Sequence, residues 1–272
     1  MRLSLLKGCN NIRNIFDSHC HYNDPAFDED RYLLLDRMLS SPDSPIDKLT
    51  HASTDVASSR FGIELAKKYK NFYTSIGFHP EVIDELPADW EQQLEQLYQE
   101  ACVTQRLVAV GEIGLDYHYE GYDKPKQLAL FEGQVQFALK KSLPVIVHCR
   151  DAVQDCMEIL HRYQPRGVMH CFSGSAETAL EVVKLGMYVG FTGSLAFKNN
   201  KKGRAVIAAV PLDRILFETD CPYMAPPPYR GHRSESYMIE EVAKVAGEVK
   251  GIAPQKMIDI TNENACRLFG IK

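Results

Sequence analysis

The chain has 272 residues, of which 45% are hydrophobic and 25% are charged, and its formal net charge is −5. This length and composition suit one large globular domain with a substantial core. The acidic balance excludes a broad basic surface, so an anionic ligand would have to meet a local patch of positive charge, and no stretch is long and apolar enough to cross a membrane.

The N-terminal residues and the cysteines indicate a cytoplasmic protein. Arg2 and Lys7 flank a leucine-containing stretch that is too short for the apolar core of a signal peptide. The eight cysteines form no C-x-x-C pair, which favours reduced thiols over a disulfide framework or a zinc ribbon. We therefore expect a cytoplasmic monomer without membrane contact, although the sequence leaves a nuclear or organellar location open.

Strands and helices are predicted to alternate from residue 14 onward. The first strand begins at Ile15 and ends in His19 and His21. The later predicted strands are residues 49–54, 72–78, 107–111, 144–147, 167–169, 187–192 and 214–217. The predicted helices are residues 28–41, 56–69, 89–102, 124–142, 152–163, 176–185, 203–210, 237–250 and 254–269.

This alternation predicts an α/β fold with eight strands, a (β/α)8 TIM barrel. Several of the middle and late strands are continuous apolar runs, as is typical of parallel strands that are covered on both faces. We expect a single hydrolase domain over residues 1–272, with the barrel from about residue 14 and an N-terminal tail over residues 1–13. A doubly wound open sheet is the alternative, but no G-x-G-x-x-G motif follows the first strand.

Residue types that commonly bind metals, histidine and acidic residues, lie where the predicted strands end. His19 and His21 are two residues apart, so in a strand both point to one face. The others follow later strands: Glu112, His148, His170 and Asp220. In a barrel all of these ends meet at one mouth, where the active sites of such enzymes lie. Six N and O ligands exceed the three protein ligands of an open catalytic zinc, and they fit two ions about 3.5–4 Å apart with a bridging carboxylate.

Seven short motifs extend along the chain. They are residues 17–21 (DSHCH), 77–80 (GFHP), 111–117 (GEIGLDY), 144–151 (PVIVHCRD), 170–175 (HCFSGS), 218–223 (ETDCPY) and 230–233 (RGHR). Together they resemble the TatD family of metal-dependent hydrolases, within the amidohydrolase superfamily of barrels. The resemblance covers essentially the whole chain, and the combination of motifs is far more specific than any one of them.

The resemblance implies a metal-dependent deoxyribonuclease that hydrolyses phosphodiester bonds of DNA, as a 3′→5′ exonuclease on single strands. It implies two divalent ions, and the sequence leaves open whether they are Mg, Mn, Zn or Ni. One ion would be held by His19, His21 and Asp220. The other would be held by His148 and His170, with Glu112 as the bridge.

Catalytic and substrate-binding roles are predicted from the chemistry of each residue and its place near a strand end. Glu112 as the bridge and Asp220 as the group that orients or deprotonates the attacking water are the expected catalytic residues. The expected phosphate contacts are His79, Arg150, Arg230 and Arg233, all close to strand ends or in the loop after the last strand. His79 as a structural loop histidine and Arg150 as a local ion-pair partner of Asp151 are the alternatives.

Two other functions compete with the nuclease. The first is another hydrolase with the same two-metal site, such as a D-aminoacyl-tRNA deacylase or an enzyme acting on other esters or amides. The second is a non-catalytic barrel that serves as a binding scaffold, which the complete set of ligands disfavours.

Overall fold

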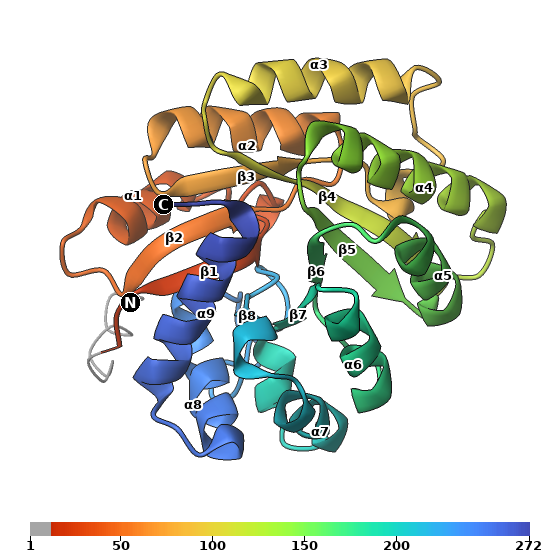
Figure 1. Cartoon of the computed structure of the whole chain (residues 1–272). Helices are drawn as coiled ribbons and strands as arrows, with labels where there is room; N and C mark the ends of the chain where they lie inside the picture. The colour runs from red at the N-terminus through yellow and green to blue at the C-terminus, as the bar shows by residue number, and fades with distance from the viewer. Residues whose placement is uncertain (1–11) are drawn as a thin grey trace.

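The computed structural model describes residues 12–272, so the predicted tail up to residue 11 lies outside the described residues. Eight parallel strands form one sheet in the order β1 to β8, and the helices surround it (Figure 1). The strands are β1 (Ile15–Cys20), β2 (Ile46–His51), β3 (Phe72–Ile76), β4 (Leu107–Asp116), β5 (Val145–Arg150), β6 (Gly167–Met169), β7 (Tyr188–Phe191) and β8 (Ile215–Phe217). The α-helices are α1 (Arg31–Ser40), α2 (Val56–Lys68), α3 (Trp90–Cys102), α4 (Lys124–Lys141), α5 (Val153–Tyr163), α6 (Ala176–Lys184), α7 (Lys201–Ala209), α8 (Ile239–Lys250) and α9 (Pro254–Phe269).

The sheet closes where the chain after β8 meets the end of β1. Cys20 and Cys221 form a parallel bridge, and the His21 N–H donates to the Cys221 carbonyl at 3.0 Å. The Asp220 N–H donates to the His19 carbonyl at 3.0 Å. The predicted (β/α)8 barrel is therefore confirmed, and the alternative of an open doubly wound sheet is wrong.

Burial explains why the strands are so apolar. Val145, Ile146 and Val147 of β5 are all fully buried, because one strand face lines the barrel interior and the other lies under the helices. Near the N-terminal strand ends a separate apolar cluster includes Ile146, Val168 and Leu216, together with Phe269 of α9. Hydrophobic side chains thus fill that end of the barrel.

The same strand faces carry polar side chains toward the opposite end. Residues two apart in a strand share a face, so His148 follows Ile146 on β5 and His170 follows Val168 just beyond β6. β5 and β6 therefore present carbon to the bottom of the barrel and a potential metal ligand to its mouth.

Two predicted boundaries shift in ways that matter. β4 runs to Asp116 instead of ending at residue 111, so Glu112 lies inside the strand. β2 begins at Ile46 and ends at His51, and Asp55 then caps α2 by accepting the Ser58 N–H. Within the described residues, no helix combines the length and apolar character that a membrane span requires.

Candidate metal centre

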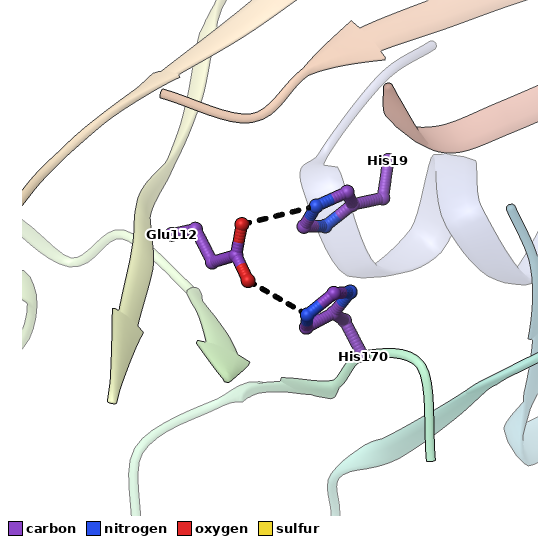
Figure 2. Close-up of side chains that lie close together, drawn as sticks. All are labelled: His19, Glu112 and His170. Carbon is purple, nitrogen blue, oxygen red and sulfur yellow. Dashed lines mark ion pairs between the residues drawn. The ribbon is translucent and has the colours of Figure 1, made fainter. Parts of the chain in front are cut away.

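Glu112 lies at the centre of a ring of imidazoles at the mouth of the barrel. Its Oε2 is 3.2 Å from His19 Nε2 and 3.5 Å from His21 Nε2. Its Oε1 is 2.7 Å from His170 Nε2 and 3.0 Å from His148 Nδ1. Figure 2 shows the two oxygens pointing to different histidines, His19 on one side and His170 on the other. The carboxylate therefore faces two separate sets of ligand atoms.

Asp220 joins the set on the Oε2 side. Its Oδ1 lies 3.2 Å from His21 Nε2 and 3.6 Å from His19 Nε2. Ligand atoms of His19, His21 and Asp220 all lie within 4.8 Å of one another, as do those of His19, Glu112 and His170. The structure thus brings together all six residues that the sequence predicts as ligands.

Two of the outward nitrogens, those of His21 and His148, also have the partners expected around a metal. A histidine that binds a metal usually donates its other N–H to a carbonyl or carboxylate, which fixes its tautomer. His21 Nδ1 lies 2.9 Å from the Ala52 carbonyl, and His148 Nε2 lies 2.9 Å from Asp116 Oδ2. His170 Nδ1 lies 3.8 Å from Glu218 Oε1, beyond hydrogen-bond distance. Neither it nor His19 Nδ1 has a hydrogen-bond partner among the described residues. The donor set and its surroundings fit divalent ions held by imidazole and carboxylate.

The electrostatics of the bridge position favour a cation. Burial alone would raise the pKa of Glu112, but the surrounding imidazoles, led by His170 and His19, hold that pKa well below its usual range. Burial and the neighbouring His170 lower the pKa of His19 to about 4. Glu112 is thus a buried, ionised carboxylate beside a neutral imidazole that can act as a ligand.

Two other histidines hold protons tightly when no metal competes for them. Burial opposes the charge on His21, yet its hydrogen bond to Asp220 and the charge of Glu112 raise the pKa of His21 to about 9. Burial is likewise outweighed at His148, where hydrogen bonds to Asp116 and Glu112 raise the pKa to about 10. The carboxylates therefore stabilise positive charge at the centre, and either protons or metal ions can carry that charge.

Glycines let β4 and β5 approach closely beside the centre. A Cβ on Gly111 would lie 2.6 Å from the Cβ of Ile146. Gly114 has φ +149°, and a Cβ there would lie 1.9 Å from the His148 carbonyl oxygen. Only glycine allows this contact, which sets His148 next to Glu112.

A pocket of about 700 Å³ opens above the ligands, and His79 and Arg150 contribute to its lining. Arg150 donates to the Tyr119 hydroxyl at 3.5 Å, whereas Asp151, its alternative partner, pairs with His118 at 2.8 Å. Among the described residues that line the pocket, Arg150 is the one arginine or lysine.

His79 is held in a tautomer that donates toward the centre. It precedes the short 3₁₀ helix η2 (Pro80–Val82), and its Nδ1 accepts the Glu81 N–H at 3.2 Å. A neutral imidazole with Nδ1 as acceptor carries its proton on Nε2, which lies 3.5 Å from Glu112 Oε1. Burial and the neighbouring His148 lower the pKa of His79, so the ring is neutral. His79 is close enough to form a third metal-binding group with Glu112 and His148, but this tautomer suits an anion better.

The structure does not bring Arg230 and Arg233 to the pocket lining. Arg233 pairs with Asp30 and Glu235, each at 2.7 Å, so its guanidinium fork is already filled. Arg230 stacks on the Phe197 ring, 4.2 Å from the ring centroid. Both arginines are thus engaged by contacts outside the pocket.

Asp116 and Glu218 are site residues that the sequence reasoning missed as partners of the ligands. Asp116 lies four residues after Glu112 in β4 and therefore on the same strand face. Glu218 directly follows β8 and accepts the Cys171 N–H at 2.5 Å, beside His170. For Asp116 the two-residue period of strands was the signal, and it was hidden because the predicted strand ended too early.

Comparison with known proteins finds hydrolases that match almost the whole chain. The family model described as TatD related DNase matches residues 16–270. A relative from Bacillus subtilis, named uncharacterized metal-dependent hydrolase YabD, is 36% identical over 94% of this chain and 99% of its own length. A relative from Cronobacter sakazakii, named 3′-5′ ssDNA/RNA exonuclease TatD, is 29% identical over 94% of this chain and 97% of its own. The crystal structure of YJJV, a TatD homologue from Escherichia coli, has a TM-score of 0.87 at 28% identity and covers 95% of this chain and 99% of that one.

Proposed function

Because the chain belongs to the family of TatD-related DNases and metal-dependent hydrolases, we propose that it hydrolyses phosphodiester bonds of single-stranded DNA from the 3′ end. The family match over residues 16–270 supports the proposal that the chain acts as a single hydrolase domain. The name of the Cronobacter relative supports the 3′→5′ direction and a single-stranded substrate.

The observation that carries the proposal is the division of Glu112 between two ligand sets. Oε2 faces His19 and His21, whereas Oε1 faces His148 and His170. One carboxylate that presents each oxygen to a different histidine pair is what a bridge between two ions requires. His19, His21 and Asp220 would hold one ion, His148 and His170 the other, and Glu112 both.

When bound, the ions would supply Lewis acidity toward the phosphate oxygens and would bring the pKa of the attacking water near neutrality. The two carboxylates differ in exposure, which separates their roles. The Glu112 side chain is 4% exposed and the Asp220 side chain 16%, so Asp220 is the more accessible of the two from the pocket. Burial would raise the pKa of Asp220, but its hydrogen bond to His21 and the nearby imidazoles lower it. Asp220 is thus ionised and can orient the water and accept its proton.

His79 and Arg150 would hold the phosphate. The protonated Nε2 of His79 donates one hydrogen bond, and the guanidinium of Arg150 offers a planar fork that matches two phosphate oxygens. Asp24 and Glu81 also line the pocket and oppose an extended run of phosphates. A pocket of about 700 Å³ has room for the end of a strand, which favours exonucleolytic over internal cleavage.

The test is digestion of a 5′-labelled single strand by the full chain with Mg²⁺ or Mn²⁺. We expect a ladder that shortens from the 3′ end, with slower digestion of a blunt duplex of the same sequence. A strand that stays intact with every ion would refute the nuclease. The alternative hydrolase would then be tested by release of a D-amino acid from charged tRNA, which the nuclease proposal does not predict.

A further inference from the structure

Two tyrosines lie exposed at the mouth of the pocket, on opposite sides of the barrel. Tyr119 follows β4, Tyr223 follows β8, and both line the pocket. Because β4 and β8 are four strands apart in a ring of eight, these loops face each other across the mouth. Tyr119 is 59% exposed and Tyr223 is 57% exposed. Rings that serve packing are normally covered, so exposed aromatic rings at a pocket rim point to a ligand.

The Tyr119 ring is held in place from one side. The Arg150 guanidinium carbon lies 5.3 Å from its centroid, and an Arg150 N–H donates to its hydroxyl at 3.5 Å. The preceding residue, His118, pairs with Asp151 at 2.8 Å and ties the loop after β4 to the loop after β5. The exposed part of the ring is therefore a preformed surface that carries the positive charge of Arg150 beside it.

The opposite wall is formed by Tyr223 and Met224. The Tyr223 hydroxyl donates to Asp24 Oδ2 at 3.1 Å, and Met224 is 37% exposed. Met224 has φ +57°, a conformation that residues with a side chain rarely adopt. A Cβ on Gly193 would lie 2.0 Å from the Met224 carbonyl oxygen, so a glycine is required under this loop. The backbone thus accepts an unfavourable conformation while two large apolar side chains face the pocket.

We propose that these two walls, Tyr119 on Arg150 and Tyr223 with Met224, bind the unpaired nucleobases on either side of the scissile phosphate. The inference rests on the proposed function and adds the part of the substrate that the rim recognises. Base faces stack on aromatic rings with little regard to sequence. Asp24 and Glu81 lie on the same rim and repel phosphates. Paired bases cannot present their faces, so the walls select single strands.

The test is binding of a fluorescent oligonucleotide to the metal-loaded full chain, measured by anisotropy. Its last linkages are phosphorothioates that resist hydrolysis, and a second strand of equal length carries abasic residues at its 3′ end. Tyr119→Ala and Tyr223→Ala should each weaken binding of the strand with bases about 5- to 140-fold, the range expected for one stacked base. Neither should change binding of the abasic strand. Tyr119→Phe, which keeps the ring, should bind like the wild type.

Tyr32→Ala is the matched control, because Tyr32 is 53% exposed on α1 and lies outside the pocket lining. If a tyrosine-to-alanine variant loses the circular dichroism of the folded protein, the tyrosine is changed to leucine instead. Leucine keeps most of the side-chain volume but has no aromatic face. Equal wild-type affinity for both strands, or unchanged binding in both tyrosine variants, would overturn the inference. Base-dependent binding without cleavage of a normal strand would uphold it and refute the nuclease. Normal cleavage with unchanged binding in both variants would refute the inference and uphold the nuclease.

Discussion

Asp116 and His148 form a carboxylate–imidazole pair that sets the direction of one expected ligand. Asp116 Oδ2 lies 2.9 Å from His148 Nε2, so His148 Nδ1 faces Glu112 and the centre. We predict that Asp116→Asn lowers the affinity for Mn²⁺ about 10- to 100-fold, as is typical when the outer partner of a ligand is removed. Calorimetric titration of metal-stripped protein measures this affinity.

The control for this variant is Asp151→Asn. Asp151 also pairs with a histidine, His118 at 2.8 Å, but both side chains are exposed and neither is part of the centre. Its affinity for Mn²⁺ should equal that of the wild type. Equal affinities for all three proteins would show that Asp116 does not position His148.

The raised pKa values of His21 and His148 give metal binding a defined dependence on pH. At pH 7 both imidazoles carry a proton, because their pKa values are raised to about 9 and about 10. These protons must leave when the nitrogens bind a metal. Affinity for Mn²⁺ should therefore rise between pH 6.5 and 8.5, by up to about tenfold per unit for each proton released.

The measurement is the same titration repeated across this pH range. The slope should be smaller in Asp116→Asn, since Asp116 is one of the carboxylates that raise the pKa of His148. An affinity that is constant from pH 6.5 to 8.5 would contradict the protonated state of both rings.

The six expected ligands could be found from the sequence because each stands at a strand end and because the motifs match a known family. Their outer partners could not be found so directly. Asp116 is part of the GEIGLDY motif, but its role depends on β4 continuing past Glu112, which the glycines at 111 and 114 concealed. Arg233 shows the opposite case, because nothing in its local sequence reveals that Asp30 fills its fork.

At the scale of elements, Asp17 ties β1 to the chain after β8. Its Oδ1 accepts the Thr219 N–H at 3.0 Å, and its Oδ2 accepts the hydroxyls of Thr219 and Ser236 at 2.6 Å each. The side chain is fully buried, and burial raises its pKa to about 6. This contact lies two residues from His19 and closes the barrel beside the centre.

We predict that Asp17→Ala lowers the free energy of unfolding by about 4 kcal/mol or more, since these three donors and the His19 N–H lose their acceptor and each costs about 1–3 kcal/mol. Asp17→Asn should lose much less, because its carbonyl keeps the backbone contact and the two hydroxyls can rotate to accept from the amide. It also removes a charge that burial disfavours. Urea unfolding at pH 7 compares the two, and equal stability of both variants with the wild type would rule out this role.

Element positions were easier to predict than element ends. Continuous apolar runs mark β5 to β8, because both faces of those strands are covered. β2 was harder, since Asp47 and Lys48 interrupt its pattern and the strand starts at Ile46. The predicted β4 ended too early, because the second half of the strand carries glycines and acidic residues that contact the centre and the neighbouring strand.

At the scale of the whole molecule, the ions should stabilise the fold. The expected ligands come from β1, from β4 to β6 and from the loop after β8, so bound ions would link segments far apart in the sequence. At 100 times the dissociation constant, one site adds about 2.7 kcal/mol, which corresponds to about 5–11 °C in melting temperature for a chain of this size. A thermal melt with Mn²⁺ and with EDTA tests this, and identical melting temperatures would contradict it.

The barrel itself could be predicted, because the order of strands and helices along the chain determines both the eight alternating units and the single mouth where the strand ends meet. What the sequence could not provide is the shape of the mouth. The exposure of Tyr119 and Tyr223, and the commitment of Arg230 to Phe197, depend on how loops from distant strands meet.

The most direct test of the account is the turnover of a 5′-labelled single strand by Glu112→Gln. Glutamine keeps the shape of the side chain but cannot bridge two cations as a carboxylate does. We predict that the hydrolysis rate falls more than about 100-fold, since even an outer partner is worth 10- to 100-fold, while circular dichroism stays that of the wild type. A folded Glu112→Gln protein that cleaves the strand at the wild-type rate would contradict the two-ion centre.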